Sequence, residues 1–68
     1  MNIGDTVMFT NEASRYAKWF YSQIGIVKSM KNGHCRVEWV QPVAYHDGYT
    51  RQSDFEQTNF TTFSQQGE

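Results

Sequence analysis

The chain has 68 residues, of which eleven are aromatic, and its formal net charge is −1. This length excludes a second domain, and in so small a domain the aromatic side chains must supply much of the buried area. The single cysteine excludes an internal disulfide framework, no apolar run is long enough to span a membrane, and residues 1–5 lack a secretory signal. We therefore expect a cytoplasmic protein.

The first predicted strand covers residues 6–10, where alternation places Val7 and Phe9 on one face. Residues 11–23 follow it and contain several aromatic and basic side chains. They show neither the period of 2 that is typical of a strand nor the period of 3.6 that is typical of a helix. We predict a long structured loop for this segment.

The strongest local signal is a β-hairpin over residues 24–40. Asn32-Gly33 favours a two-residue type I′ turn, which places Lys31 opposite His34. Regular pairing beyond the turn gives the pairs Met30–Cys35, Lys28–Val37 and Ile26–Trp39. The predicted core face of the hairpin is Ile26, Met30, Cys35, Val37 and Trp39. Lys28 breaks this face, and we expect a β-bulge or a position at the rim to accommodate it.

A three-residue turn would shift these partners but would leave Cys35, Val37 and Trp39 on one face. Further along the chain, Pro42 has no N–H to donate and is predicted to end or kink the third strand. A second turn is predicted at residues 46–48, between strands near residues 43–45 and 49–51.

The last part of the chain predicts a helical turn and a short strand. Ser53 and Glu56 have capping-box spacing, which predicts that a single helical turn starts there. Residues 60–63 are predicted to form the closing strand. Residues 64–68 are polar and predict a flexible tail.

This order of elements predicts an all-β fold, namely a small five-stranded SH3-like barrel over residues 1–63 with one short helical turn before the last strand. Gly25-Ile26-Val27 and Cys35-Arg36-Val37-Glu38-Trp39 resemble the paired strands of KOW and Tudor-type modules. Over about residues 4–63 the chain also resembles the small SH3-like extrinsic subunits of photosystem I and of the photosynthetic NDH complex. The matching positions are Trp19, Gly25 with Val27, Val37 with Trp39, and Phe55 with Glu56. Such fold-level motifs occur with many functions.

The sequence predicts no catalytic centre. His34 and Cys35 are adjacent, but neighbouring residues of a strand point to opposite faces, so they cannot act together. Cys35 falls on the predicted core face, where a thiol behaves as a small hydrophobic group. The two histidines and the cysteine lack metal-ligand spacing, and the glycines form no phosphate-binding loop. We therefore predict a non-enzymatic protein with no cofactor, metal or small-molecule substrate.

Aromatic residues outside the strand cores are the main candidates for binding. They are Tyr16, Trp19, Phe20, Tyr21, Tyr45 and Tyr49. SH3-like barrels use such residues to line grooves for proline-rich peptides or cages for methylated lysine. Each of them also has an alternative role in the core, and we expect two or three of the set to remain exposed.

Charge is distributed unevenly along the chain. Residues 13–37 carry five cations and no acid, whereas residues 38–68 carry five acids and one cation. Folding either interleaves these charges or forms a basic face that steers an acidic partner. We predict a monomeric protein-interaction module that docks on a larger protein or complex, which we expect to be acidic. The predicted binding residues are Arg15, Tyr16, Lys18, Trp19, Tyr21, Lys31, Tyr45 and Tyr49.

The alternative is a KOW- or Tudor-like nucleic-acid-binding protein, because cations interleave with aromatic residues between positions 15 and 36. The pI near 6.0 argues against this alternative, since nucleic-acid-binding domains usually have a pI above about 9. A free-standing domain of this size is typical of small phage or bacterial accessory proteins.

Overall fold

The computed structural model describes residues 1–63, which form one antiparallel five-stranded sheet with the strand order β4-β3-β2-β1-β5. The strands are β1 (Thr6–Phe9), β2 (Ile24–Lys31), β3 (His34–Tyr45), β4 (Gly48–Glu56) and β5 (Phe60–Thr62). Two short helices accompany them, α1 (Ala17–Phe20) and the 3-10 helix η1 (Gln57–Asn59). The predicted all-β fold is confirmed. The tail predicted for residues 64–68 lies outside the described residues.

The hydrophobic core covers one face of the sheet and joins α1 to it. Its buried residues are Val7, Phe9, Phe20, Val27, Cys35, Val37, Trp39, Val43 and Phe60. Val7 and Phe9 are fully buried, so the alternation predicted for β1 is confirmed. The Phe9 ring lies 5.2 Å from Phe55 and 5.5 Å from Phe60 between centroids, both edge to face. This contact ties β1 to β4 and β5 at opposite edges of the sheet.

The β2–β3 turn has the predicted geometry. Asn32 and Gly33 both adopt positive φ angles, of 53° and 81°, as a type I′ turn requires. Lys31 opposes His34 and Met30 opposes Cys35, so the predicted register is confirmed next to the turn.

Beyond Ser29 the predicted register is wrong because β2 contains a bulge. Ser29 opposes Arg36 and Val27 opposes Val37, which leaves Lys28 as an extra residue. A bulge places two consecutive side chains on one side of the sheet, and both Lys28 and Ser29 are exposed. As a result Val27, rather than the predicted Ile26, reaches the core.

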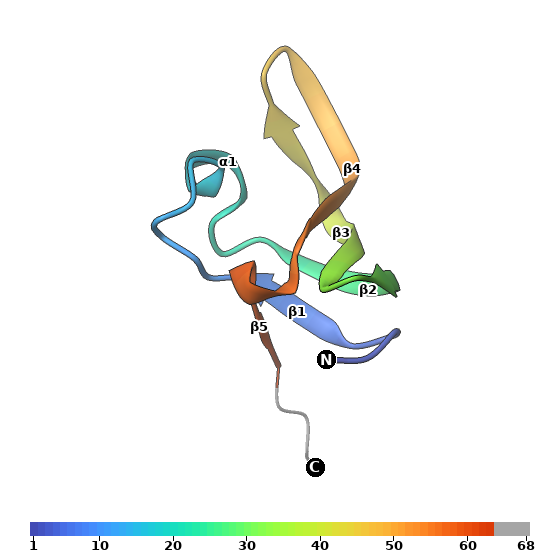
Figure 1. The fold of residues 1–68 in the computed structure, drawn as a ribbon. Coiled ribbons are helices and arrows are strands. Elements are labelled where there is room, and N and C mark those ends of the chain that lie inside the picture. Colours follow the sequence, from blue (N-terminus) through green and yellow to red (C-terminus); the bar gives the residue numbers. More distant parts are fainter. Residues whose placement is uncertain (64–68) are drawn as a thin grey trace.

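Strand β3 continues through Pro42, although the prediction allowed it to end there. Its pairing with β4 is interrupted between Glu38 and Val43, so this segment bends without terminating. The second turn then consists of His46 and Asp47, since Tyr45 opposes Gly48. Figure 1 shows the end of this β3–β4 hairpin rising away from β1, β2 and β5.

Two local predictions are wrong. The capping box does not form, because Ser53 and Glu56 belong to β4 and the helical turn η1 begins after them without a side-chain cap. The segment 11–23 is also not entirely a loop, since it contains α1. This helix is a single turn, closed by hydrogen bonds from the N–H of Phe20 to the Tyr16 carbonyl and from the N–H of Tyr21 to the Ala17 carbonyl. One turn is too short to give a helical period in the sequence.

Candidate functional site

Helix α1 is held against the core by Phe20, whose ring stacks on Trp39 with 5.2 Å between centroids. The turn that leads into it is fixed by Ser14, which accepts hydrogen bonds from the N–H groups of Tyr16 and Ala17. Tyr16 and Trp19 are three residues apart, so they lie on the same side of the helical turn. Both are half-buried.

A cluster of aromatic rings links α1 to the end of β3. The Trp19 ring packs nearly perpendicular to Tyr45 at 4.9 Å, and Tyr16 lies 6.3 Å from Trp19 and 6.5 Å from Tyr45. His46, in the turn, lies 5.0 Å from Trp19 and 4.2 Å from Tyr45. The Lys18 ammonium lies 4.4 Å from the centre of the Trp19 ring, in cation–π contact.

We call this region the aromatic–basic surface. It consists of Arg15, Tyr16, Lys18, Trp19, Tyr45 and His46. Arg15 and Lys18 are exposed, and neither forms an ion pair within residues 1–63. Sequence reasoning found five of these six residues, and treated His46 as a turn residue and as a histidine without metal-ligand spacing. Its position directly after Tyr45, at the start of the predicted turn, was the available signal.

Three predicted binding residues lie outside this surface. The Tyr21 hydroxyl donates a hydrogen bond to the Glu12 carboxylate at 3.1 Å, and this bond together with the Glu12 charge raises the pKa of Tyr21. Tyr49 is exposed over 77% of its surface. These two exposed aromatic residues agree with the number that was expected. Lys31 lies at the end of β2, next to the β2–β3 turn.

The cations of residues 13–37 do not form a single basic face. Lys28 forms an ion pair with Glu38 at 3.2 Å, and the Arg36 guanidinium lies 3.5 Å from the Asp54 carboxylate. Lys31 is on the same outer side of the sheet as Arg36. Folding therefore interleaves part of the basic segment with acids. Arg15 and Lys18 are exposed without an ion pair among the described residues, and the Lys18 ammonium lies over the Trp19 ring.

A groove of about 330 Å³ adjoins the aromatic–basic surface. Tyr16, Phe20 and Tyr45 line one side of it, and residues of β4 between Thr50 and Phe55 line the other. The Phe55 ring, which belongs to this lining, lies 5.5 Å from the Tyr16 ring between centroids. The groove thus has an aromatic wall and a strand wall, which suits a ligand with one apolar group and a polar backbone.

The chain matches no family model, no curated protein and no solved structure. No helix within residues 1–63 is long and apolar enough to cross a membrane. The chemistry of the surfaces therefore carries the functional assignment.

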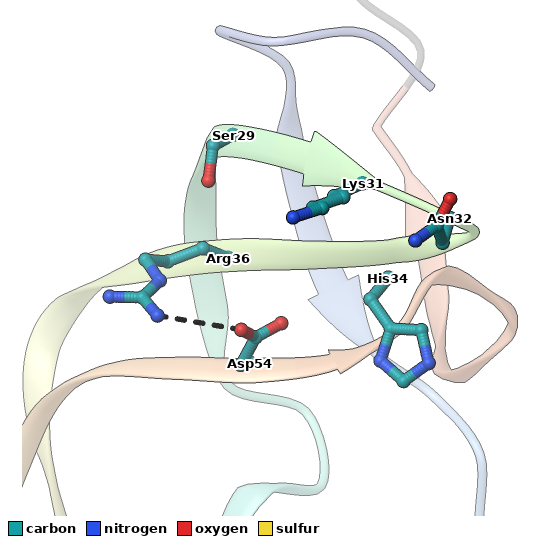
Figure 2. Close-up of a pocket in the computed structure, with 6 residues that line it drawn as sticks. All are labelled: Ser29, Lys31, Asn32, His34, Arg36 and Asp54. Carbon is teal, nitrogen blue, oxygen red and sulfur yellow. Dashed lines mark hydrogen bonds and ion pairs between the residues drawn. The ribbon is translucent and has the colours of Figure 1, made fainter.

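A second, larger concavity of about 550 Å³ lies over the outer side of the sheet. Its lining residues are Ser29, Lys31, Asn32, His34, Arg36 and Asp54. Figure 2 shows the Arg36 guanidinium turned toward Asp54, with Lys31 and His34 on neighbouring strands. All six lining residues are polar or charged, and the Arg36–Asp54 pair compensates part of the charge. It is less suited to hold a partner than the groove beside Tyr16.

Cys35 is fully buried, as predicted, while its neighbour His34 is exposed on the outer side. Burial raises the pKa of the Cys35 thiol, and the negative charge of Asp54 raises it further. A nucleophilic cysteine needs a lowered pKa and access to substrate, and Cys35 has neither. Within residues 1–63, no group of three or more His, Cys, Asp or Glu side chains is arranged to hold a metal ion.

Proposed function

We propose that the chain is a non-catalytic interaction module that docks on a larger, acidic protein or complex through the aromatic–basic surface. The observation that carries this proposal is the half-buried cluster of Tyr16, Trp19 and Tyr45 with the Lys18 ammonium beside it. Aromatic rings held in place by neighbouring rings give contact area at a low cost in conformational entropy, and they are enriched among the residues that dominate protein interfaces.

The charge of this surface favours an acidic partner. Arg15 and Lys18 are exposed cations with no ion pair among the described residues. Cations next to aromatic anchors steer an acidic partner toward the surface and fix its orientation after contact.

We also propose that the sheet belongs to the SH3-like barrel class. The support is the order of the elements, with β1 pairing with both β2 and β5 and with the single turn η1 directly before β5. The resemblance to small extrinsic subunits of photosynthetic complexes fits a module that docks on a larger assembly. Fold-level likeness alone assigns no partner.

Nucleic-acid binding is the alternative function, and Lys18 beside Trp19 is the observation that favours it. A base would need a free face of the Trp19 ring, but the Lys18 ammonium and the Tyr45 and His46 rings all lie within 5.0 Å of the Trp19 ring centre. The pI near 6.0 also disfavours the close approach of many phosphates. A protein partner is the better supported function.

Affinity capture from an extract of the source organism tests the proposal when three forms of the chain are used as bait. These are the wild type, Lys18→Glu and, as a control of equal charge change on the outer side, Lys31→Glu. We expect the wild type and Lys31→Glu to retain a stoichiometric acidic protein after nuclease treatment, and Lys18→Glu to lose it. Loss of every partner after nuclease would instead support nucleic-acid binding, and equal loss with both variants would remove the aromatic–basic surface as the docking site.

A further inference from the structure

Within residues 1–63, strand β4 forms an open edge of the sheet. It pairs with β3 on one side, and it is the terminal strand in the order β4-β3-β2-β1-β5. With nine residues it is much longer than β5, the three-residue strand at the other edge. Open edges are commonly protected by proline, by charged residues (lysine above all) or by a covering segment; β4 contains no proline or lysine, and its charged residues are Arg51, Asp54 and Glu56.

The ladder determines which backbone groups of β4 face this edge. Lys31 and His34 close a two-residue turn, so they form a hydrogen-bonded pair. Hydrogen bonding alternates along an antiparallel strand, and so the next residue of β3, Cys35, directs its N–H and C=O toward Phe55 of β4. Asp54, one residue before Phe55, therefore directs its own N–H and C=O outward.

Two observed hydrogen bonds agree with this alternation. The Thr50 hydroxyl donates to the Gln52 carbonyl at 2.8 Å, and the Asn59 side-chain amide donates to the Glu56 carbonyl at 3.2 Å. Gln52 and Glu56 each lie two residues from Asp54, so their carbonyl groups face outward as the Asp54 groups do. Among the described residues, the chain thus satisfies the edge carbonyls of Gln52 and Glu56 and leaves the Asp54 groups between them for another strand.

The groove lies along this same edge. Its strand wall is the stretch of β4 from Thr50 to Phe55, and its opposite wall is Tyr16 and Tyr45. A strand that pairs with β4 continues the sheet, so its inward side chains lie beside these rings. Arg15 and Lys18 flank this aromatic wall along the chain and are exposed.

We propose that the docking segment of the partner is an extended acidic strand that pairs with the open edge of β4. One inward apolar side chain enters the groove beside Tyr16, and its inward acidic neighbours face Arg15 and Lys18. The outward side chains of the segment are uncharged, because they lie next to Asp54 and Glu56. This inference rests on the proposed function and specifies how the partner binds.

Other occupants fit the edge less well. Two antiparallel copies of β4 would bring the exposed Asp54 and Glu56 of both copies onto one side of the sheet, where like charges repel. A nucleic acid would place phosphates beside the same carboxylates, and it could not use the N–H and C=O groups of Asp54 together as a pairing strand does.

A synthetic strand tests the proposal with the whole chain. The probe is the peptide acetyl-Thr-Glu-Thr-Phe-Thr-Glu-Thr-amide, which has Glu and Phe on one side and Thr on the other. Two further peptides carry N-methyl groups on the backbone. The first is methylated at its Glu and Phe residues, and the second is methylated at its inner Thr residues. Because alternate N–H groups of a strand face its neighbour, one methylated peptide loses the hydrogen bonds to β4 and the other keeps them. A fourth peptide with Lys in place of Glu controls for charge.

We expect the unmethylated acidic peptide to bind, to quench tryptophan fluorescence and to shift the amide resonances of Gln52 and Asp54. One methylated peptide should bind about tenfold more weakly or worse, and the other within about twofold of the parent. The Lys peptide should bind far more weakly than the parent.

Three results would overturn strand pairing. Equal binding of both methylated peptides would show that the segment docks without the β4 edge, while the proposed function would stand. If the acidic peptide does not bind while capture of an acidic protein still depends on Lys18, strand pairing would be overturned and the proposed function would stand. A dimer that forms with concentration and shifts the Asp54 amide would assign the edge to a second copy.

Discussion

The Trp39 indole N–H donates a hydrogen bond to the Ser53 hydroxyl at 3.0 Å, across the β3–β4 pairing. Trp39 is 3% exposed, and its ring stacks on Phe20 of α1. The bond gives the indole the partner that a buried tryptophan needs. It also explains why Ser53 does not cap η1, since its hydroxyl is turned toward β3. One side chain therefore connects β3, β4 and the helix that carries the aromatic–basic surface.

Trp39→Ala is expected to destabilise the fold by about 3–5 kcal/mol, because it opens a large cavity under α1. Trp39→Phe keeps most of the packing and loses the hydrogen bond to Ser53, so a smaller loss of about 1–3 kcal/mol is expected. Urea unfolding followed by circular dichroism measures both values. A Trp39→Ala variant that unfolds at the wild-type urea concentration would place this ring outside the core.

Gly25→Ala is expected to be strongly destabilising. A Cβ at Gly25 would overlap the Val37 side chain and lie 3.0 Å from the Glu38 carbonyl oxygen, in the pairing of β2 with β3. Overpacking of this kind costs about 1–3 kcal/mol. Gly48→Ala is the matched control, because a Cβ there meets nothing within 4 Å. Thermal unfolding of the two variants should differ by several degrees, and equal melting temperatures would contradict the close approach of β2 and β3.

The sequence allowed the strands to be predicted where a turn fixed the pairing. Asn32-Gly33 set the register as far as Ser29, because a two-residue turn has few geometries. The bulge at Lys28 could be anticipated only because regular pairing would have placed a charged side chain on the core face. Its position depends on how β2 bends over the core, and this is a tertiary property.

The candidate site was predictable in part for a similar reason. The sequence showed that aromatic and basic residues were in excess, but Tyr45 reaches Trp19 only because β3 continues past Pro42 and raises the β3–β4 hairpin toward α1. Lys31 is in the same basic segment as Lys18, yet the pairing of β2 with β3 places it on the outer side of the sheet. Distance along the chain gave no indication of that separation.

Cys35 is expected to react slowly with thiol reagents in the absence of denaturant, since it is fully buried and only the thiolate reacts. The rate should rise to that of a free thiol in about 6 M urea. Ellman's reagent, followed by absorbance, measures both rates. Rapid labelling of the native chain would show that Cys35 does not face the core.

The raised pKa of Cys35 also predicts how stability depends on pH. The folded chain holds the thiol proton more tightly than the unfolded chain, so this stabilisation is complete below the ordinary pKa of the thiol. It is lost as the pH rises through the raised pKa. The stability difference between the wild type and Cys35→Ala should therefore narrow between about pH 7 and about pH 10 in urea titrations. A stability difference between the two chains that widens with pH would contradict a raised pKa of Cys35.

Association kinetics give the sharpest separation between an acidic protein and a nucleic acid as the partner. With the captured protein, Lys18→Glu should lower the association rate and make the remaining affinity less sensitive to salt, while Lys31→Glu should have the smaller effect. With an oligonucleotide, each lost phosphate contact would lower the slope of log affinity against log salt by about 0.7–0.9.

The first measurement in this comparison is a salt titration of the wild type against single-stranded and duplex oligonucleotides. Charge contacts are strongest at low salt, where any binding to nucleic acid would be easiest to detect. Even at about 50 mM salt we expect no binding, because Arg15 and Lys18 supply only a small positive charge beside the acidic residues of β4. Trp19→Ala would weaken either kind of complex, as a lost anchor or a lost stacking platform, and so it does not discriminate. Tight oligonucleotide binding at about 50 mM that disappears by about 200 mM would instead assign the aromatic–basic surface to nucleic acid.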